Sequence, residues 1–139
     1  MSEQGFSNFE NESAANFISE VIVNGYGLIT IALDHILDET EPPDIIECEE
    51  ALIAAEFIAA SCMQPASDFP ENAAEWVAMN MVEGSTAQME ITALADKAAE
   101  AIDKVVTDSE LKILWEETPY FDLWFKAQQD LQNRLLGDS

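Results

Sequence analysis

Positive charge is what this sequence has least of. Its 139 residues contain 28 Asp and Glu but only 5 Lys and Arg, which gives a formal net charge of −23. Residues 1–96 contain no base, and the five bases that follow are Lys97, Lys104, Lys112, Lys126 and Arg134. Because nucleic acids and anionic membranes are bound through such residues, we expect neither as a direct partner. The charge far exceeds the roughly 2 to 8 that keeps a small domain soluble, which favours a basic protein partner.

Histidine and cysteine are also scarce, and this excludes most metal centres. His35 is the only histidine, whereas a di-metal site in a four-helix bundle takes one from each of two helices. Cys48 and Cys62 fall about 21 Å apart along one predicted helix, so we interpret them as buried, reduced thiols. The sequence has no calcium loop, phosphate-binding glycine loop or nucleophile elbow. We expect no metal, no cofactor and no enzymatic activity.

Long apolar runs are absent as well. None approaches the roughly 20 residues that span a bilayer, and residues 1–12 lack the basic and apolar regions of a secretory signal. We therefore expect a cytoplasmic protein. The length suits one helical domain over residues 1–139, and a hydrophobic fraction of 48% is typical of a globular chain.

The sequence does contain a series of helical patterns separated by proline and glycine. Apolar residues recur at helical spacing over roughly 11–24, 27–39, 44–63, 68–82 and 86–106. Thr107, with Glu110 three residues later, is typical of a capping box for a sixth helix, and Thr118 begins a seventh. We see no strand pattern. The sequence predicts an all-α fold, a single compact bundle of six or seven helices around a central Ala-rich helix.

The third predicted helix is the expected centre of that bundle. Its C-terminal half is apolar almost all round, as in a fully buried helix, except for Glu56. A buried charge is costly unless it is paired or hydrogen-bonded. We interpret Glu56 as a buried structural carboxylate that accepts hydrogen bonds from backbone N–H groups or a Trp indole, with residues 5–12 as the expected donor segment. The alternative interpretation is a catalytic or metal-binding carboxylate.

Acidic residues are densest between the second and third predicted helices. Part of this cluster favours the helix dipole at the start of the third helix, but the rest adds repulsion. A docking surface for a basic partner and an ordinary solvated corner are both consistent with it. The candidate partner-binding residues are Asp38, Glu39, Glu41, Asp44, Glu47, Glu49 and Glu50.

Three segments resemble the bacterial domain-of-unknown-function 4259 family. Residues 5–17 are similar to its Gly-x-x-x-Phe-[Asp/Glu]-Asn-Asp-x-Ala opening, with Glu12 in place of the Asp that follows Asn. Residues 48–60 are similar to its Ala-rich helix with a central Glu, here Glu56. Residues 108–117 are similar to its Ser-Glu-Leu-x-x-Leu-Trp signature. The resemblance implies a small helical bacterial protein and assigns no catalytic residue.

The leading functional hypothesis is an acidic binding protein that neutralises a basic partner. By analogy with other small acidic proteins, it would be a cognate immunity protein that inhibits a nuclease-like bacterial toxin domain. The alternative is a stand-alone regulatory or housekeeping helical domain, either monomeric or a homo-oligomer such as a homodimer. Adaptation to a saline cytoplasm is a third explanation for the acidity.

Overall fold

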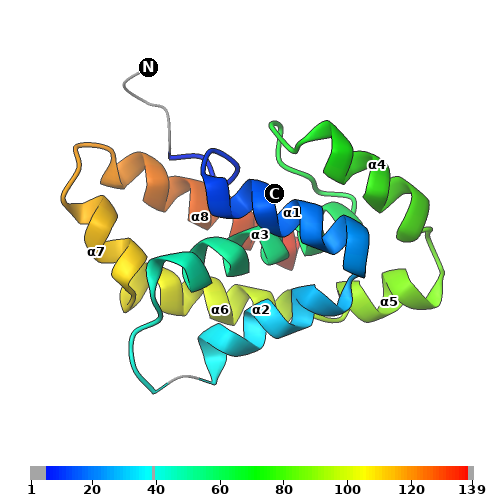
Figure 1. The fold of residues 1–139 in the computed structure, drawn as a ribbon, viewed down its shortest axis with the longest axis horizontal. Coiled ribbons are helices and arrows are strands. Elements are labelled where there is room, and N and C mark those ends of the chain that lie inside the picture. The colour runs from blue at the N-terminus through cyan, green and yellow to red at the C-terminus, as the bar shows by residue number, and fades with distance from the viewer. Residues whose placement is uncertain (1–5, 39, 138–139) are drawn as a thin grey trace.

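Helices account for almost all of the regular structure in the computed structural model, which describes residues 6–38 and 40–137. Within these residues the chain forms eight helices and no strand. They are α1 (Glu12–Asn24), α2 (Gly27–Leu37), α3 (Ile45–Ser61), α4 (Glu71–Asn80), α5 (Thr86–Thr92), α6 (Ala95–Thr107), α7 (Glu110–Glu116) and α8 (Phe121–Leu136) (Figure 1). The predicted all-α class is confirmed.

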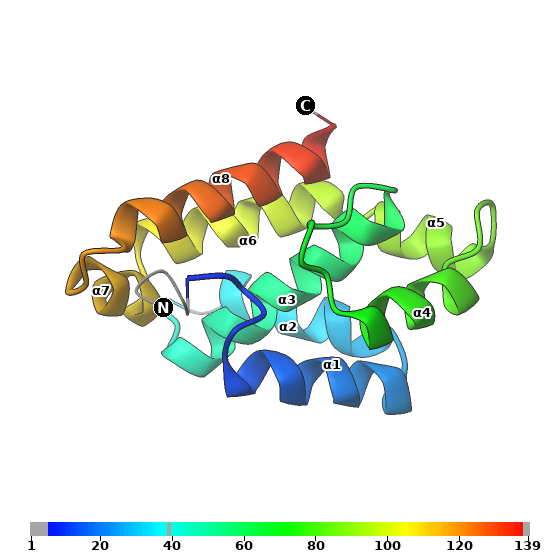
Figure 2. The same ribbon diagram turned by 90° about the horizontal axis from the view of Figure 1, so that it is seen from above.

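Helix α3 is the centre of the structure, as predicted. It contacts each of the other seven helices, and Figure 2 shows it between α1 and α2 on one side and α6 and α8 on the other. Every residue from Ala51 to Ser61 is buried. The small side chains of Ala51, Ala55 and Ala59 let the neighbouring helices approach closely, so one helix can serve as the core of the bundle.

The predicted single helix over residues 86–106 is wrong, because the chain turns at Ala93 and Leu94 between α5 and α6. The hydroxyl of Thr92 donates to the backbone carbonyl of Gln88 at 2.9 Å, a bond that competes with regular helix geometry. In α5 the side chain of Ile91 is 1% exposed, whereas that of Met89 is 56% exposed. This break raises the number of helices above the expected six or seven.

Both cysteines are free thiols. Cys48 is buried at the start of α3, and burial raises the pKa of its thiol to about 12. Cys62, just beyond the other end of α3, is partly exposed, and burial raises its pKa as well. Neither thiol is activated as a nucleophile.

The cap of α7 differs from the predicted capping box. Ser109, not Thr107, is the N-cap: its Oγ accepts a hydrogen bond from the backbone N–H of Lys112 at 3.0 Å. The same hydroxyl donates to the carbonyl of Val105 at 2.6 Å, so it joins the end of α6 to the start of α7. The hydroxyl of Thr107 instead donates to the carbonyl of Asp103 on the exposed surface of α6.

Replacing the two hydroxyls separately tests this assignment. We expect Ser109→Ala to lower the free energy of unfolding by about 1–2 kcal/mol, because it removes a cap and leaves buried backbone groups without a partner. Thr107→Ala is the matched control and should cost less than about 0.5 kcal/mol, as exposed substitutions usually do. Urea unfolding of both variants measures the difference. Equal losses would contradict the assignment of Ser109 as the cap.

Candidate functional site

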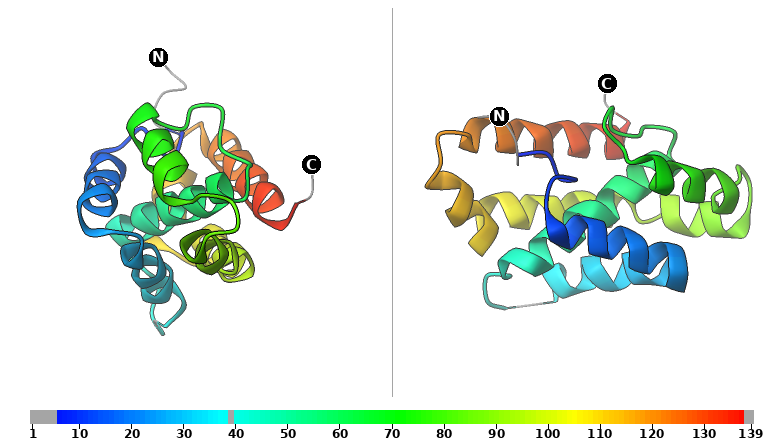
Figure 3. Two further views of the ribbon diagram at one scale, coloured as in Figure 1. Left: turned by 90° about the vertical axis from the view of Figure 1, so that its right-hand side faces the viewer. Right: turned by 45° about the horizontal axis from the view of Figure 1, so that its top comes forward.

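The segment before α1 crosses the surface of α3 and reaches toward α8 (Figure 3). Its path is set by Asn11, the N-cap of α1, whose Oδ1 accepts from the backbone N–H of Ala14 at 2.7 Å. The side-chain amide of Asn11 also donates to the carbonyl of Asn8 at 3.3 Å. These contacts close a tight turn that directs Asn8, which is 7% exposed, into the protein.

Asn8 connects Glu56 on α3 to Gln128 on α8. Its Nδ2 donates to Glu56 Oε2 and to Gln128 Oε1, both at 3.0 Å, and Gln128 Nε2 donates back to Asn8 Oδ1 at 2.8 Å. Glu56 is 3% exposed and Gln128 is fully buried. The expected donor segment does supply a hydrogen bond to Glu56, but the donor is a side-chain amide and not a backbone N–H or an indole.

Arg134, near the end of α8, is the second partner of Glu56. Its Nη1 donates to Glu56 Oε1 at 3.2 Å and to the carbonyl of Gln64 at 3.0 Å. Its Nε donates to Asp130 Oδ2 at 2.7 Å. The side chain of Arg134 is 14% exposed, so one of the five bases lies largely within the protein. We call Asn8, Glu56, Gln128 and Arg134 the Glu56 network.

Burial raises the pKa of Glu56 above its ordinary value of 4.5, and the charge of Arg134 and the amide of Asn8 only partly offset this effect. Because the folded state binds this proton more tightly than the unfolded state, the contribution of Glu56 to stability falls as pH rises above about 4.5. The network therefore makes the buried charge tolerable rather than favourable.

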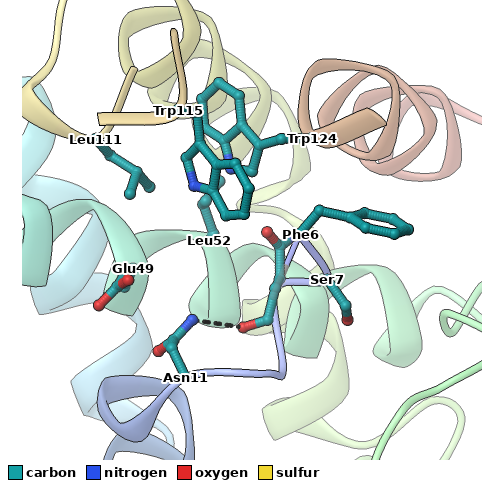
Figure 4. Close-up of a pocket in the computed structure, with 9 residues that line it drawn as sticks. Phe6, Ser7, Asn11, Glu49, Leu52, Leu111, Trp115 and Trp124 are labelled. Atoms are coloured by element: carbon teal, nitrogen blue, oxygen red, sulfur yellow. Dashed lines mark hydrogen bonds between the residues drawn. The ribbon is translucent and has the colours of Figure 1, made fainter. Parts of the chain in front are cut away.

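Two hollows flank the N-terminal segment. The first, about 20 Å³, lies against the stacked indoles of Trp115 and Trp124, whose ring centroids are 6.2 Å apart (Figure 4). Such a volume holds about one water molecule and is too small for an organic substrate. The second, about 320 Å³, opens over Glu56 and Arg134 and is also lined by Asp68 and Asp130.

Neither hollow contains an evident catalytic arrangement. Both oxygens of Glu56 have hydrogen-bond partners, and its side chain is 4% exposed, so it is poorly placed to exchange protons with a substrate. Within residues 6–38 and 40–137, no three His, Cys, Asp or Glu side chains are grouped so that they would hold a metal ion. No buried side-chain nitrogen or oxygen in this part of the chain lacks a hydrogen-bond partner. The arrangement is that of a structural connection.

The structure places most of the acidic cluster where α2 is joined to α3. Asp38, Glu41 and Asp44 are exposed, and Glu47 is partly exposed; Glu39 lies outside the described residues. Asp44 and Glu47 also form a capping box: Glu47 N donates to Asp44 Oδ1 at 2.8 Å, and Asp44 N donates to Glu47 Oε1 at 3.2 Å. These two carboxylates therefore have a local structural use in addition to their charge.

Glu49 and Glu50 point to different sides of α3. Glu50 follows Glu47 by three residues and shares its face of the helix, whereas Glu49 lines the small hollow beside Trp115. Burial raises the pKa of Glu50, and the charges of Glu20, Asp44 and Glu47 raise it further, while His35 lowers it. We define the acidic corner as Asp38, Glu41, Asp44, Glu47 and Glu50, to which the structure adds Glu20 from α1.

Burial raises the pKa of Glu49 too, with a hydrogen bond from Ser13 as the partial offset. The structure therefore does not bring all seven predicted residues to one surface. Helical spacing alone separates positions 49 and 47 by about 200° around the axis, so this split could have been read from the sequence.

Sequence reasoning missed Gln128, Arg134 and Glu20. A signal existed for Gln128, because it lies between Trp124 and Leu131 on the apolar stripe of α8. For Arg134 the only signal was that the sequence contains few bases that could pair with a buried acid. The proximity of Glu20 depends on how α1 packs against α3, which the sequence does not show.

Removing Arg134 tests the balance within the Glu56 network. We expect Arg134→Leu to lower the free energy of unfolding at about pH 8 by about 3–5 kcal/mol, because it leaves a buried carboxylate without its cation. The loss should shrink toward pH 4.5, where Glu56 takes up a proton. Asp130→Asn is the control: its carboxylate is 67% exposed, and we expect a change below about 1 kcal/mol. Urea unfolding across this pH range gives both values, and a pH-independent loss for Arg134→Leu would contradict the account.

Comparison with known proteins identifies a family but no characterised relative. No curated protein and no solved structure matches the chain. A family model described as "Domain of unknown function (DUF4259)" matches residues 4–127, which include Asn8, Glu56 and the indoles of Trp115 and Trp124. Gln128 and Arg134 lie just beyond the match. Since the match covers most of the chain, the chain belongs to the DUF4259 family.

Proposed function

We propose that this protein is an acidic binding protein that neutralises a basic protein partner in the cytoplasm. The partner we propose is a nuclease-like toxin domain, which would make the protein its cognate immunity protein. The acidic corner would be the docking surface. No catalytic step, metal or cofactor takes part in this function.

The observation that carries the proposal is the crowding of like charges at the acidic corner. Glu50 is held close enough to Glu20, Asp44 and Glu47 for their charges to raise its pKa. Asp38 and Glu41 add exposed carboxylates to the connection that leads from α2 into α3. Such repulsion costs folding free energy, and a cationic partner would relieve it on binding.

Three of the five Lys and Arg residues pair with acids that are not part of the acidic corner. Lys97 pairs with Asp34, Lys112 with Glu116 at 3.0 Å, and Arg134 with Glu56 and Asp130. His35 is the nearby group that opposes the crowding. The carboxylates of the acidic corner are in none of these ion pairs, so their negative charge can attract a cationic partner.

This charge arrangement suits a toxin that cleaves nucleic acid. A nuclease needs a cationic cleft for the phosphate backbone, and a row of carboxylates can occupy such a cleft in place of phosphates. Long-range attraction would also accelerate association, toward about 10⁸ M⁻¹ s⁻¹ or more at low salt, compared with about 10⁵–10⁶ M⁻¹ s⁻¹ for uncharged surfaces.

Association kinetics with the protein encoded by the adjacent gene test the proposal. We expect a 1:1 complex whose association rate falls at least about tenfold between low and high salt, because salt screens the attraction. The variant Asp38→Asn/Glu41→Gln/Glu50→Gln should slow association at low salt by about the same factor. It leaves the capping box of Asp44 and Glu47 intact.

The matched control is Glu83→Gln/Asp103→Asn/Glu117→Gln, which removes the same charge from exposed positions outside the corner. It should slow association much less than the corner variant does. Equal effects of the two variants would refute the site and leave only a dependence on net charge. A rate and affinity that neither variant nor salt alters would refute the proposed function.

A further inference from the structure

An apolar groove lies at the opposite end of α3 from the acidic corner. It is formed where the C-terminal end of α3 and the following connection face α4, and it encloses about 260 Å³. Its residues are predominantly small or apolar: Ala60, Ser61, Met63, Pro65, Phe69, Ala74, Val77, Ala78 and Met81. Figure 1 shows α4 and the α2–α3 connection at opposite ends of the molecule. We call this feature the α3–α4 groove.

Met63 gives the groove an exposed apolar rim at a conformational cost. Its φ is 69°, in the left-handed region, and it is the only such non-glycine residue in the described part of the chain. The local hydrogen bonds are those of a Schellman motif: Gln64 N donates to Ala59 O at 2.9 Å and Met63 N to Ala60 O at 3.0 Å. Glycine is usual at this position because it has no Cβ to clash. Here a methionine takes it and is 77% exposed.

The groove is lined by one aromatic ring, that of Phe69, which packs against other rings, and by the exposed side chain of Met63. The ring of Phe69 packs edge-on against Phe57, with centroids 5.8 Å apart, and Phe57 packs in the same way against Trp76 at 5.4 Å. Methionine side chains are unbranched and polarizable and fit varied apolar surfaces. A groove lined by Phe69 and Met63 suits an inserted apolar side chain.

The charges beside the groove indicate which segment would fill it. Glu71 and Glu75 are exposed on α4 and, by helical spacing, flank Ala74 and Ala78 on the side away from the core. Residues 1–96, which include the whole groove, contain no Lys or Arg, and Arg134, which reaches the carbonyl of Gln64 beside the groove, is paired with Glu56 and Asp130. A second copy of the chain would bring another net charge of −23 to this surface, so self-association there is disfavoured.

We propose that the α3–α4 groove binds an amphipathic, lysine- or arginine-rich helix of the partner protein. Apolar side chains of that helix would enter between Met63 and Val77, while its cations would face Glu71 and Glu75. The proposal rests on the proposed function for the basic character of the partner. It gives the two surfaces different kinetic roles. The acidic corner speeds association, whereas the groove slows dissociation through apolar contacts that salt does not screen.

The two surfaces are compatible with one partner. Helix α3 has 17 residues, so its ends are about 25 Å apart. An interface of ordinary size, about 800 Å² on each protein, is wide enough to extend over that distance.

Methyl NMR of the full chain, labelled at the methionine methyl groups, tests the groove directly. The probe is an 18-residue helical peptide of Leu and Lys in an amphipathic pattern; the control peptide replaces every Lys with Glu. We expect the Lys peptide to shift the methyl signals of Met63 and Met81, which line the groove. Met79 and Met89 are internal controls, because they are exposed but do not line it. Equal shifts at all four methionines, or equal binding of the Glu peptide, would overturn the proposal.

Met63→Gly separates binding from folding. Glycine should raise the melting temperature by relieving the left-handed conformation, and it should weaken binding of the Lys peptide about tenfold by removing the rim. Ala78→Gln, an exposed and helix-compatible change that fills the groove, should weaken binding similarly, whereas Met79→Gln should not. Unchanged affinity in both Met63→Gly and Ala78→Gln would overturn the proposal.

The same titration distinguishes this inference from the proposed function. The corner variant Asp38→Asn/Glu41→Gln/Glu50→Gln should leave the Met63 and Met81 shifts intact. If the Lys peptide fails to bind the groove, but association with the partner still depends on salt and on the acidic corner, only the groove proposal is refuted. If the Lys peptide binds the groove, but the corner variant associates with the protein encoded by the adjacent gene as fast as the unchanged protein does, only the proposed docking surface is refuted.

Discussion

The carboxylate of Glu56 lies in the most apolar helix of the protein, and its neutralisation joins parts of the chain that are distant in sequence. Asn8 reaches it from the N-terminal segment, and Arg134 reaches it from the end of α8. An unpaired charge at this place would cost several kcal/mol, so the N-terminal segment and α8 must both dock against α3 for the fold to be stable. Glu56 thus specifies which surfaces cover the central helix.

This constraint also shapes the outside of the molecule. Arg134 lies largely within the protein, where it pairs with Glu56, and Lys97 and Lys112 are held in ion pairs with Asp34 and Glu116. The carboxylates that crowd Glu50 take part in none of these ion pairs. The cost of the buried pair and the cost of surface repulsion are separate, because the first lies between α3 and α8 and the second between α1 and α3. A change at the acidic corner can therefore be made without disturbing the Glu56 network.

Much of the fold could be predicted from the sequence, because apolar periodicity and caps are local. Asn11 caps α1, Asp44 caps α3, and α3 is central and buried. The break at Ala93 was missed because the apolar pattern continues through it, and the cap of α7 was assigned to Thr107 because two candidate hydroxyls lie two residues apart.

Less of the candidate site could be predicted, because its partners are distant in sequence. An isolated acid in an apolar helix is expected to be buried and to have a hydrogen-bond or charge partner. Glu56 is buried as expected. Nothing local identifies that partner as Arg134, 78 residues away. The left-handed backbone and the exposure of Met63 could not be predicted for a similar reason. Its conformation follows from how α3 ends and not from its own residue type.

The most direct test of this account is a ¹³C NMR titration of the Glu56 side-chain carboxyl group in the intact protein. The account predicts an apparent pKa above 4.5, raised by burial despite Arg134, and a further rise in Arg134→Leu. A value at or below 4.5 would show that Glu56 is solvated or favourably ion-paired, and would contradict the claim that a costly buried carboxylate organises the fold.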